Sequence, residues 1–172
     1  MPASNMFTTG PNHWRSVFIS GSRSFQGRLP VSVMDHLDSI IARKLPVLIG
    51  DAPGVDAAVQ AYLAERHARE VTVFFVGRRP RHNAGGWRTQ LVDTDCPTGT
   101  RAWRGAKDRV MCHLTDVGFV IWDGASAGSF ANIRQLCQLR LPVVVYVRPQ
   151  NSILTLTTDA DRAAVLSPRH SG

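Results

Sequence analysis

The chain has 172 residues, of which 44% are hydrophobic and 19% are charged, and its formal net charge is +7. One globular domain with an ordinary core fits this composition, whereas an intrinsically disordered chain does not. No segment approaches the roughly 20 apolar residues that cross a bilayer, so we expect no membrane partner. The positive charge favours an anionic partner. Because the arginines are spread along the chain, we favour a small anionic ligand over nucleic acid.

The cysteines and histidines point away from disulfides and metals. Cys96, Cys112 and Cys137 are odd in number and form no CxxC spacing, which argues against a disulfide framework and fits a reducing cytosol. The six histidines form no HExxH motif, so we expect neither a metal site nor a cofactor. The first residues lack an apolar stretch long enough for a signal peptide, and we expect a cytoplasmic protein.

The first half of the chain alternates short apolar runs with amphipathic ones, a pattern typical of an α/β fold. The run "SVFISG" is a compact strand candidate, and the segment after it places Val33, Leu37, Ile40 and Ile41 at helical spacing. In chain order we expect strand 16–21, helix 29–44, strand 46–51, helix 54–68 and strand 71–77.

The region 77–103 breaks this alternation, since it has five arginines, two prolines and no clear period. We expect a long functional loop there, because long irregular segments in compact domains usually bind or catalyse. Its arginines could close over phosphates, with Trp87 or Trp103 stacking on a base. After it we expect helix 104–116, strand 117–124, helix 129–140, strand 141–148, a short edge strand at 153–158 and a fraying polar end.

Strands that are apolar throughout and separated by helices predict a parallel sheet covered on both faces. Right-handed crossovers then favour a doubly wound Rossmann-like α/β sheet of about five strands, in the order 3-2-1-4-5. Residues 16–150 would form this domain, 1–15 a flexible N-terminal segment and 151–172 a C-terminal tail. The loops after strands one, two and four would meet at the switch point, where such sheets bind ligands.

The loop after the fourth strand, "DGASAGS", is the strongest candidate for a phosphate site. Ser126, Gly128 and Ser129 are small donors placed where a helix begins. Backbone amides at that point would face a phosphate, which helix N-termini favour. The alternative is that Ser126 or Ser129 is only a helix cap.

The loops after the first and second strands add to this rim. Gly21–Arg23 offers amide and hydroxyl donors and a guanidinium fork suited to phosphate or carboxylate. Gly50 permits a tight exit from its strand, and Gly54 permits a close backbone approach. The alternative is an ordinary turn in which Asp51 or Asp56 is a cap.

Five stretches in this order, "FISGSRSF", "VLIGDAPGVDAAV", "GAKDRVM", "FVIWDGASAGSFANI" and "LPVVVYV", resemble the SLOG superfamily of Rossmann-like nucleotide binders. The resemblance covers about Val17 to Val147 and is closest to the YspA-like branch. That superfamily also includes DprA-type proteins and the lonely-guy phosphoribohydrolases, which release a base from a nucleoside 5′-monophosphate. Relatives often pair through helices, so the resemblance also implies a homodimer.

The resemblance assigns ligand-binding roles to residues that match the family motifs, with Arg109 or Lys107 as the basic residue of the third stretch. The phosphate-binding stretch that hydrolases write as PGGxGTxxE falls on Gly124–Ser129. The complete ligand-binding set is Gly21, Ser22, Arg23, Gly50, Gly54, Asp56, Arg109, Gly124, Ser126, Gly128, Ser129 and Asn132.

One departure from the hydrolase motif matters for chemistry. Its glutamate falls on Asn132, and an amide cannot be a general base. Another carboxylate would have to serve, and Asp123, Asp51 and Asp108 are the nearest by loop position, with Asp123 first. Asp56 or Asp123 could instead contact a ribose.

Three functions follow from these observations. The first is a domain that binds a nucleotide or nucleotide derivative, in a sensing or handling role. The second is an enzyme, a nucleoside 5′-monophosphate N-glycosidase with a non-standard carboxylate. The third and weakest is binding of single-stranded nucleic acid, as the DprA-type relatives would imply. Whether the chain is an enzyme stays open at this point.

Overall fold

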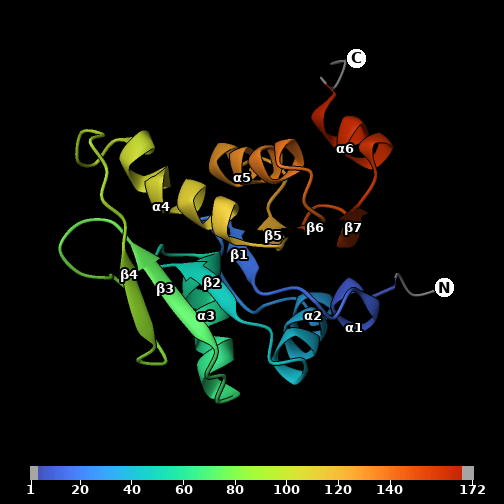
Figure 1. Cartoon of the computed structure of the whole chain (residues 1–172), viewed down its shortest axis with the longest axis horizontal. Helices are drawn as coiled ribbons and strands as arrows, with labels where there is room; N and C mark the ends of the chain where they lie inside the picture. The colour runs from blue at the N-terminus through green and yellow to red at the C-terminus, as the bar shows by residue number, and fades with distance from the viewer. Residues whose placement is uncertain (1–3, 168–172) are drawn as a thin grey trace.

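The computed structural model describes residues 4–167, which fold as a three-layer α/β domain (Figure 1). Its sheet has seven strands in the order β4-β3-β2-β1-β5-β6-β7. All neighbouring strands are parallel except β6 and β7, which are antiparallel. The strands are β1 (Val17–Gly21), β2 (Val47–Gly50), β3 (Val71–Phe75), β4 (Arg88–Leu91), β5 (Val117–Trp122), β6 (Val143–Val147) and β7 (Ser152–Leu156).

Helices cover both faces of this sheet, as Figure 1 shows. One layer contains α1, α2 and α3, and the other contains α4, α5 and α6. The helices are α1 (Met6–Thr9), α2 (Val31–Ala42), α3 (Val55–Glu65), α4 (Arg101–Leu114), α5 (Ala127–Gln138) and α6 (Asp159–Leu166). No helix within residues 4–167 has the length and apolarity that crossing a bilayer requires.

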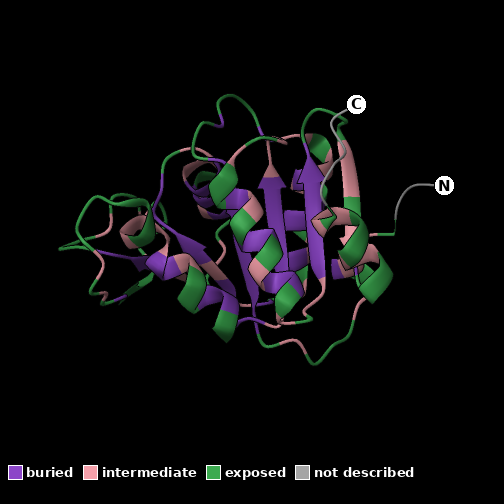
Figure 2. Cartoon of the chain, turned by 90° about the horizontal axis from the view of Figure 1, so that it is seen from above, coloured by how far each residue is buried: buried purple, intermediate pink, exposed green. Residues whose placement is uncertain are grey.

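The sheet separates two hydrophobic cores because successive side chains of a strand point to opposite faces. Ile19 of β1 packs into the core under α2 and α3, and its neighbour Phe18 packs into the core under α4 and α5. The central strands are buried almost throughout, whereas exposed residues gather on the outer faces of the helices and on the edge segments (Figure 2).

The expected α/β class and mostly parallel sheet are confirmed, but the strand count of about five and the order 3-2-1-4-5 are wrong. The five expected sheet strands are β1, β2, β3, β5 and β6, and the sheet also contains β4 at one edge and β7 at the other. β4 lies within the expected long loop, and its four residues are all exposed, so no apolar run marks it. β7 corresponds to the expected edge strand at 153–158.

The described parts of both end segments contain more secondary structure than expected. Residues 4–15 contain α1, whose Phe7 is fully buried against the first core. Residues 152–166 form the expected edge strand, β7, followed by the helix α6 where a fraying polar end was expected. The side chains of Thr158 and Asp161 close a capping box at the start of α6.

Candidate functional site

A cleft of about 1120 Å³ lies beyond the carboxyl ends of β1 and β2, between these ends and the helices α4 and α5. This is the switch point of the sheet, since the chain leaves β1 for β2 on one side and returns to β5 on the other. Its walls come from four segments: 20–24, 52–56, 101–109 and 126–135. The position expected from the sequence is therefore hollow.

The first turn of α5 faces this cleft with free backbone donors. Ser126 caps the helix by position, but its side chain accepts no amide hydrogen bond. Within residues 4–167, the amides of Ala127, Gly128 and Ser129 have no backbone or side-chain partner. A Cβ built on Gly128 would meet no atom within 4 Å. The open N-terminus is suited to an anion.

Five arginines surround the cleft, and they come from three different elements. Arg23 follows β1, and the others are on α4 and α5. Burial and the nearby guanidinium groups of Arg81 and Arg104 lower the pKa of Arg23. The cations therefore repel one another, and a bound anion would relieve that repulsion. The five are Arg23, Arg101, Arg104, Arg109 and Arg134.

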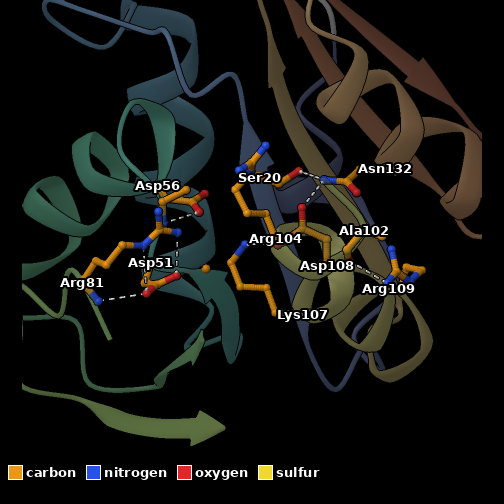
Figure 3. A network of polar contacts seen from close by, with 12 residues as sticks. Ser20, Asp51, Asp56, Arg81, Ala102, Arg104, Lys107, Asp108, Arg109 and Asn132 are labelled. Carbon is orange, nitrogen blue, oxygen red and sulfur yellow. Dashed lines mark hydrogen bonds and ion pairs between the residues drawn. The ribbon is translucent and has the colours of Figure 1, made fainter. Parts of the chain in front are cut away.

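One wall of the cleft carries a carboxylate held by an amide. The Asn132 side chain on α5 donates to the Oδ2 of Asp108 on α4 at 3.0 Å and to the Oγ of Ser20 at 3.2 Å (Figure 3). Lys107 lies 3.3 Å from the other oxygen of Asp108 and is itself buried. The amide of Asn132 therefore positions a carboxylate from the neighbouring helix.

The opposite wall carries a second, more buried carboxylate, Asp56 on α3 (Figure 3). Its Oδ2 accepts one hydrogen bond, from the amide of Ala52 at 3.2 Å. Burial raises the pKa of Asp56 to about 7, against the attraction of Lys107, and the neighbouring Asp108 raises it further. Two carboxyl groups in one cleft thus have different surroundings.

The side chains of Asp56 and Lys107 both pack against Gly50 at the end of β2, where there is no room for a side chain. A Cβ at this position would lie 2.7 Å from Asp56 Oδ2 and 2.8 Å from Lys107 Cε. Gly21 has a similar role, since a Cβ there would lie 2.6 Å from a methyl group of Val55. Both glycines are needed for packing around the cleft, and only Gly21 lines it.

Ser22 joins the loops behind the cleft instead of lining it. Its hydroxyl lies 2.9 Å from that of Ser126 and accepts from the amide of Asp123 at 3.1 Å. Its carbonyl accepts from the amide of Val55 at the start of α3. Gly54, with φ +80°, allows this contact, because a Cβ would lie 2.4 Å from the Ser22 carbonyl oxygen.

Asp123 and Asp51 stabilise loops and do not line the cleft. Asp123 Oδ1 accepts from the amides of Ala125 and Ser126 at 2.9 and 2.7 Å, and these hydrogen bonds lower its pKa against the effect of burial. Asp51 is buried and pairs with the backbone amide and guanidinium of Arg81. Among the three catalytic candidates from the sequence, only Asp108 lines the cleft.

Some of the other predicted residues line the cleft, and others lie outside it. Arg23, Asp56, Arg109 and Asn132 line the cleft, whereas Gly124 packs against Pro149 outside it. The tryptophans expected to stack on a base, Trp87 and Trp103, pack against the two cores, and neither lines the cleft. Cys112 and Cys137 are buried, as expected for packing residues.

Sequence analysis did not single out several residues that line the cleft: Ser20, Arg101, Arg104 and Arg134. The spacing of Arg101 and Arg104 in the sequence could have indicated that they belong to the site. Arg101, Arg104 and Asp108 are spaced three and four residues apart, which places them on one face of a helix. The helix begins at Arg101, three residues before the expected start at 104, directly after its cap Thr100.

The chain matches no family model and no curated protein. Its fold is similar to that of DNA processing protein A from Helicobacter pylori, with a TM-score of 0.55 at 16% sequence identity. The match covers 78% of this chain and 66% of that one, slightly under two thirds of its length. That protein binds single-stranded DNA. The likeness shows a DprA-type Rossmann-like fold, and membership of the SLOG superfamily stays a prediction.

Proposed function

We propose that the cleft binds a nucleotide or a nucleotide-derived ligand through its phosphate. The observation that carries this proposal is the open first turn of α5, whose unpaired amides face a cleft lined by five arginines. Helix N-termini and guanidinium groups are the donors that phosphates prefer. The phosphate would lie against Gly128 and Ser129, with Arg23 on the opposite side.

The polar groups deeper in the cleft would select the rest of the ligand. The carboxylate of Asp108 accepts a hydrogen bond from Asn132, whose side chain is itself held by donation to the hydroxyl of Ser20. A ribose offers hydroxyl donors that fit such an acceptor. A volume of about 1120 Å³ exceeds what a single phosphate needs and accommodates a nucleotide.

The substitution Gly128→Asp tests the phosphate site without disturbing the fold. Nothing lies within 4 Å of the new Cβ, and an acidic residue in the first turn of a helix is favourable. The variant should remain as stable as the native chain and should lose at least tenfold in affinity for nucleotides. The matched control is Gly128→Asn, which has nearly the same size without the charge and should bind more tightly than Gly128→Asp.

The ligand panel for calorimetry contains nucleoside mono-, di- and triphosphates, ADP-ribose and a single-stranded oligonucleotide. Tightest binding to one mononucleotide or to ADP-ribose supports the proposal. Tightest binding to the oligonucleotide, weakening steeply as salt rises, would make nucleic acid the partner instead. Equal affinity of Gly128→Asp and the native chain for every ligand would contradict a phosphate site at α5.

A second candidate function, hydrolysis of the N-glycosidic bond, is favoured by the position of Asp108. Its carboxylate lies beside Asn132, where hydrolases of the resembling group have their glutamate. In this reaction the oxygen of water bonds to C1′ of the ribose phosphate, and the bond from C1′ to the base nitrogen breaks. Asp108 would accept one proton from the attacking water and pass it to the base, which leaves as the neutral free base.

Base release followed by chromatography tests this second function. We expect Asp108→Asn to abolish the release, and Asp123→Asn to retain it, because Asp123 lies outside the cleft. Loss of release in Asp123→Asn alone would contradict this assignment. Absence of release from every nucleotide that binds would leave a cleft that binds without cutting.

A further inference from the structure

Asp56 is a buried carboxyl group on the wall of a cleft that is also lined by five arginines, Lys107 and a second carboxylate, Asp108. Its relative exposure is 6%, and one of its oxygens accepts a single hydrogen bond, from Ala52. No ion pair within residues 4–167 joins it to Lys107, whose ammonium contacts Asp108 instead. The negative charge of Asp56 is therefore poorly compensated.

The groups that face Asp56 come from every element around it. Lys107 on α4 and Arg23 after β1 favour its ionised form, whereas Asp108 on α4 and Asp51 after β2 favour the protonated form. Burial adds to the effect of the two acids. The residues that line the cleft include no histidine or cysteine, so no other lining side chain has an ordinary pKa near neutrality.

We propose that Asp56 makes anion binding in this cleft proton-coupled: the ligand binds together with one proton, which Asp56 takes up. The inference rests on the proposed function, since it needs an anion at α5. An arriving anion adds a negative charge to a cleft that already contains two carboxyl groups. That charge penalises ionised Asp56 and leaves the neutral form unaffected.

The direction of the effect follows from this charge. Below neutral pH, Asp56 is protonated before the anion arrives, and the anion meets no repulsion from its carboxyl group. Above it, Asp56 must either gain a proton or repel the anion, so affinity falls as pH rises through about 7. Each unit by which the anion raises the pKa of Asp56 corresponds to about a tenfold loss of affinity across the transition.

Inorganic sulfate is the appropriate probe, because its charge is constant where phosphate monoesters, with a second pKa near ~6, would titrate. The amide resonances of Gly128 and Ser129 report binding at α5. We would titrate the native chain with sulfate at several pH values from 6 to 8.5. We expect the affinity to fall about tenfold over this range. Asp56→Asn should show an affinity that does not depend on pH.

A carboxylate far from the cleft provides the matched control. Asp35 is exposed on α2, and Asp35→Asn should keep the full pH dependence of the native chain. If sulfate binds at α5 with one affinity at every pH, proton coupling is wrong while the anion site stands. If the resonances of Gly128 and Ser129 do not respond at any pH, the proposed function itself is wrong. The native series decides between these outcomes even if Asp56→Asn fails to fold.

Discussion

At the residue scale, Asp56 and Asp108 are two carboxyl groups in one cleft whose charges are compensated to different extents. Asp108 contacts an ammonium and a side-chain amide, whereas Asp56 has one backbone amide. A buried carboxylate with so little compensation destabilises the fold when it ionises. The consequence for folding can be measured separately from ligand binding.

Stability should depend on pH through Asp56. Well below pH 3.8 the group is protonated in both the folded and the unfolded chain. As pH rises to about 7, the unfolded chain loses this proton and the folded chain keeps it, so the free energy of unfolding decreases. The shift from 3.8 to about 7 sets an upper limit of roughly 4 kcal/mol on this loss.

Asp56→Asn removes that loss of stability, because an amide does not ionise. Its oxygen can still accept the hydrogen bond from the amide of Ala52. In urea unfolding at pH 8, we expect the variant to be more stable than the native chain by at least ~1 kcal/mol. At pH 3, below the pKa of the group in the unfolded chain, the two chains should differ little. The idea would be wrong if the difference between them were the same at both pH values.

Gly50 provides a second test at this scale. Gly50→Ala would place a methyl group within 2.8 Å of both Asp56 and Lys107, and we expect it to cost about 1–3 kcal/mol of stability. Gly128→Ala is the matched control, since its methyl group meets open space and should change stability by less than ~0.5 kcal/mol. Thermal unfolding compares the two, and equal losses would contradict the packing role of Gly50.

At the scale of elements, α6 depends on its capping box more than on burial, because none of its residues is buried. Thr158→Ala removes the hydroxyl that accepts from the amide of Asp161 at 3.1 Å, and we expect it to cost ~1 kcal/mol. Hydrogen exchange of the α6 amides should accelerate. Thr157→Ala is the control, because that hydroxyl contributes only a long contact of 3.5 Å. Equal exchange in both variants would contradict this role.

The elements differ in how well the sequence predicted them, for physical reasons. The buried strands β1, β2, β3, β5 and β6 are short apolar runs, and such runs are hard to mistake once helices separate them. β4 forms from "RTQL", four exposed residues whose strand conformation comes from pairing with β3. Pairing with a partner elsewhere in the chain leaves no local pattern to read.

The same distinction applies to the cleft. The Gly/Ser loop at α5 was visible because glycine, serine and a helix start are local signals. The hydrogen bond from Asn132 to Asp108 joins residues 24 positions apart on two helices, and only their packing brings them together. Asp123 looked catalytic from its place after a strand, but its oxygens accept from the next loop amides.

At the scale of the whole molecule, one sheet links two cores, and we expect them to unfold together. The tryptophans divide evenly: Trp14 and Trp87 pack on one core, and Trp103 and Trp122 on the other. Replacing either pair by phenylalanine leaves fluorescence that reports one core. In each variant, the urea midpoint from fluorescence should equal the midpoint from far-UV circular dichroism. Different midpoints in either variant would show that the two layers unfold separately.

The antiparallel strand β7 protects an edge that the cleft itself does not need. Every residue that lines the cleft precedes position 136, whereas β7 follows β6 and pairs with its outer edge. The apolar run "VVVYV" of β6 therefore depends on β7 to cover its outer edge. An uncovered apolar edge is a template for aggregation. A chain truncated after residue 150 would keep every residue that lines the cleft and would leave the outer edge of β6 uncovered, so we expect it to aggregate more readily than the full chain.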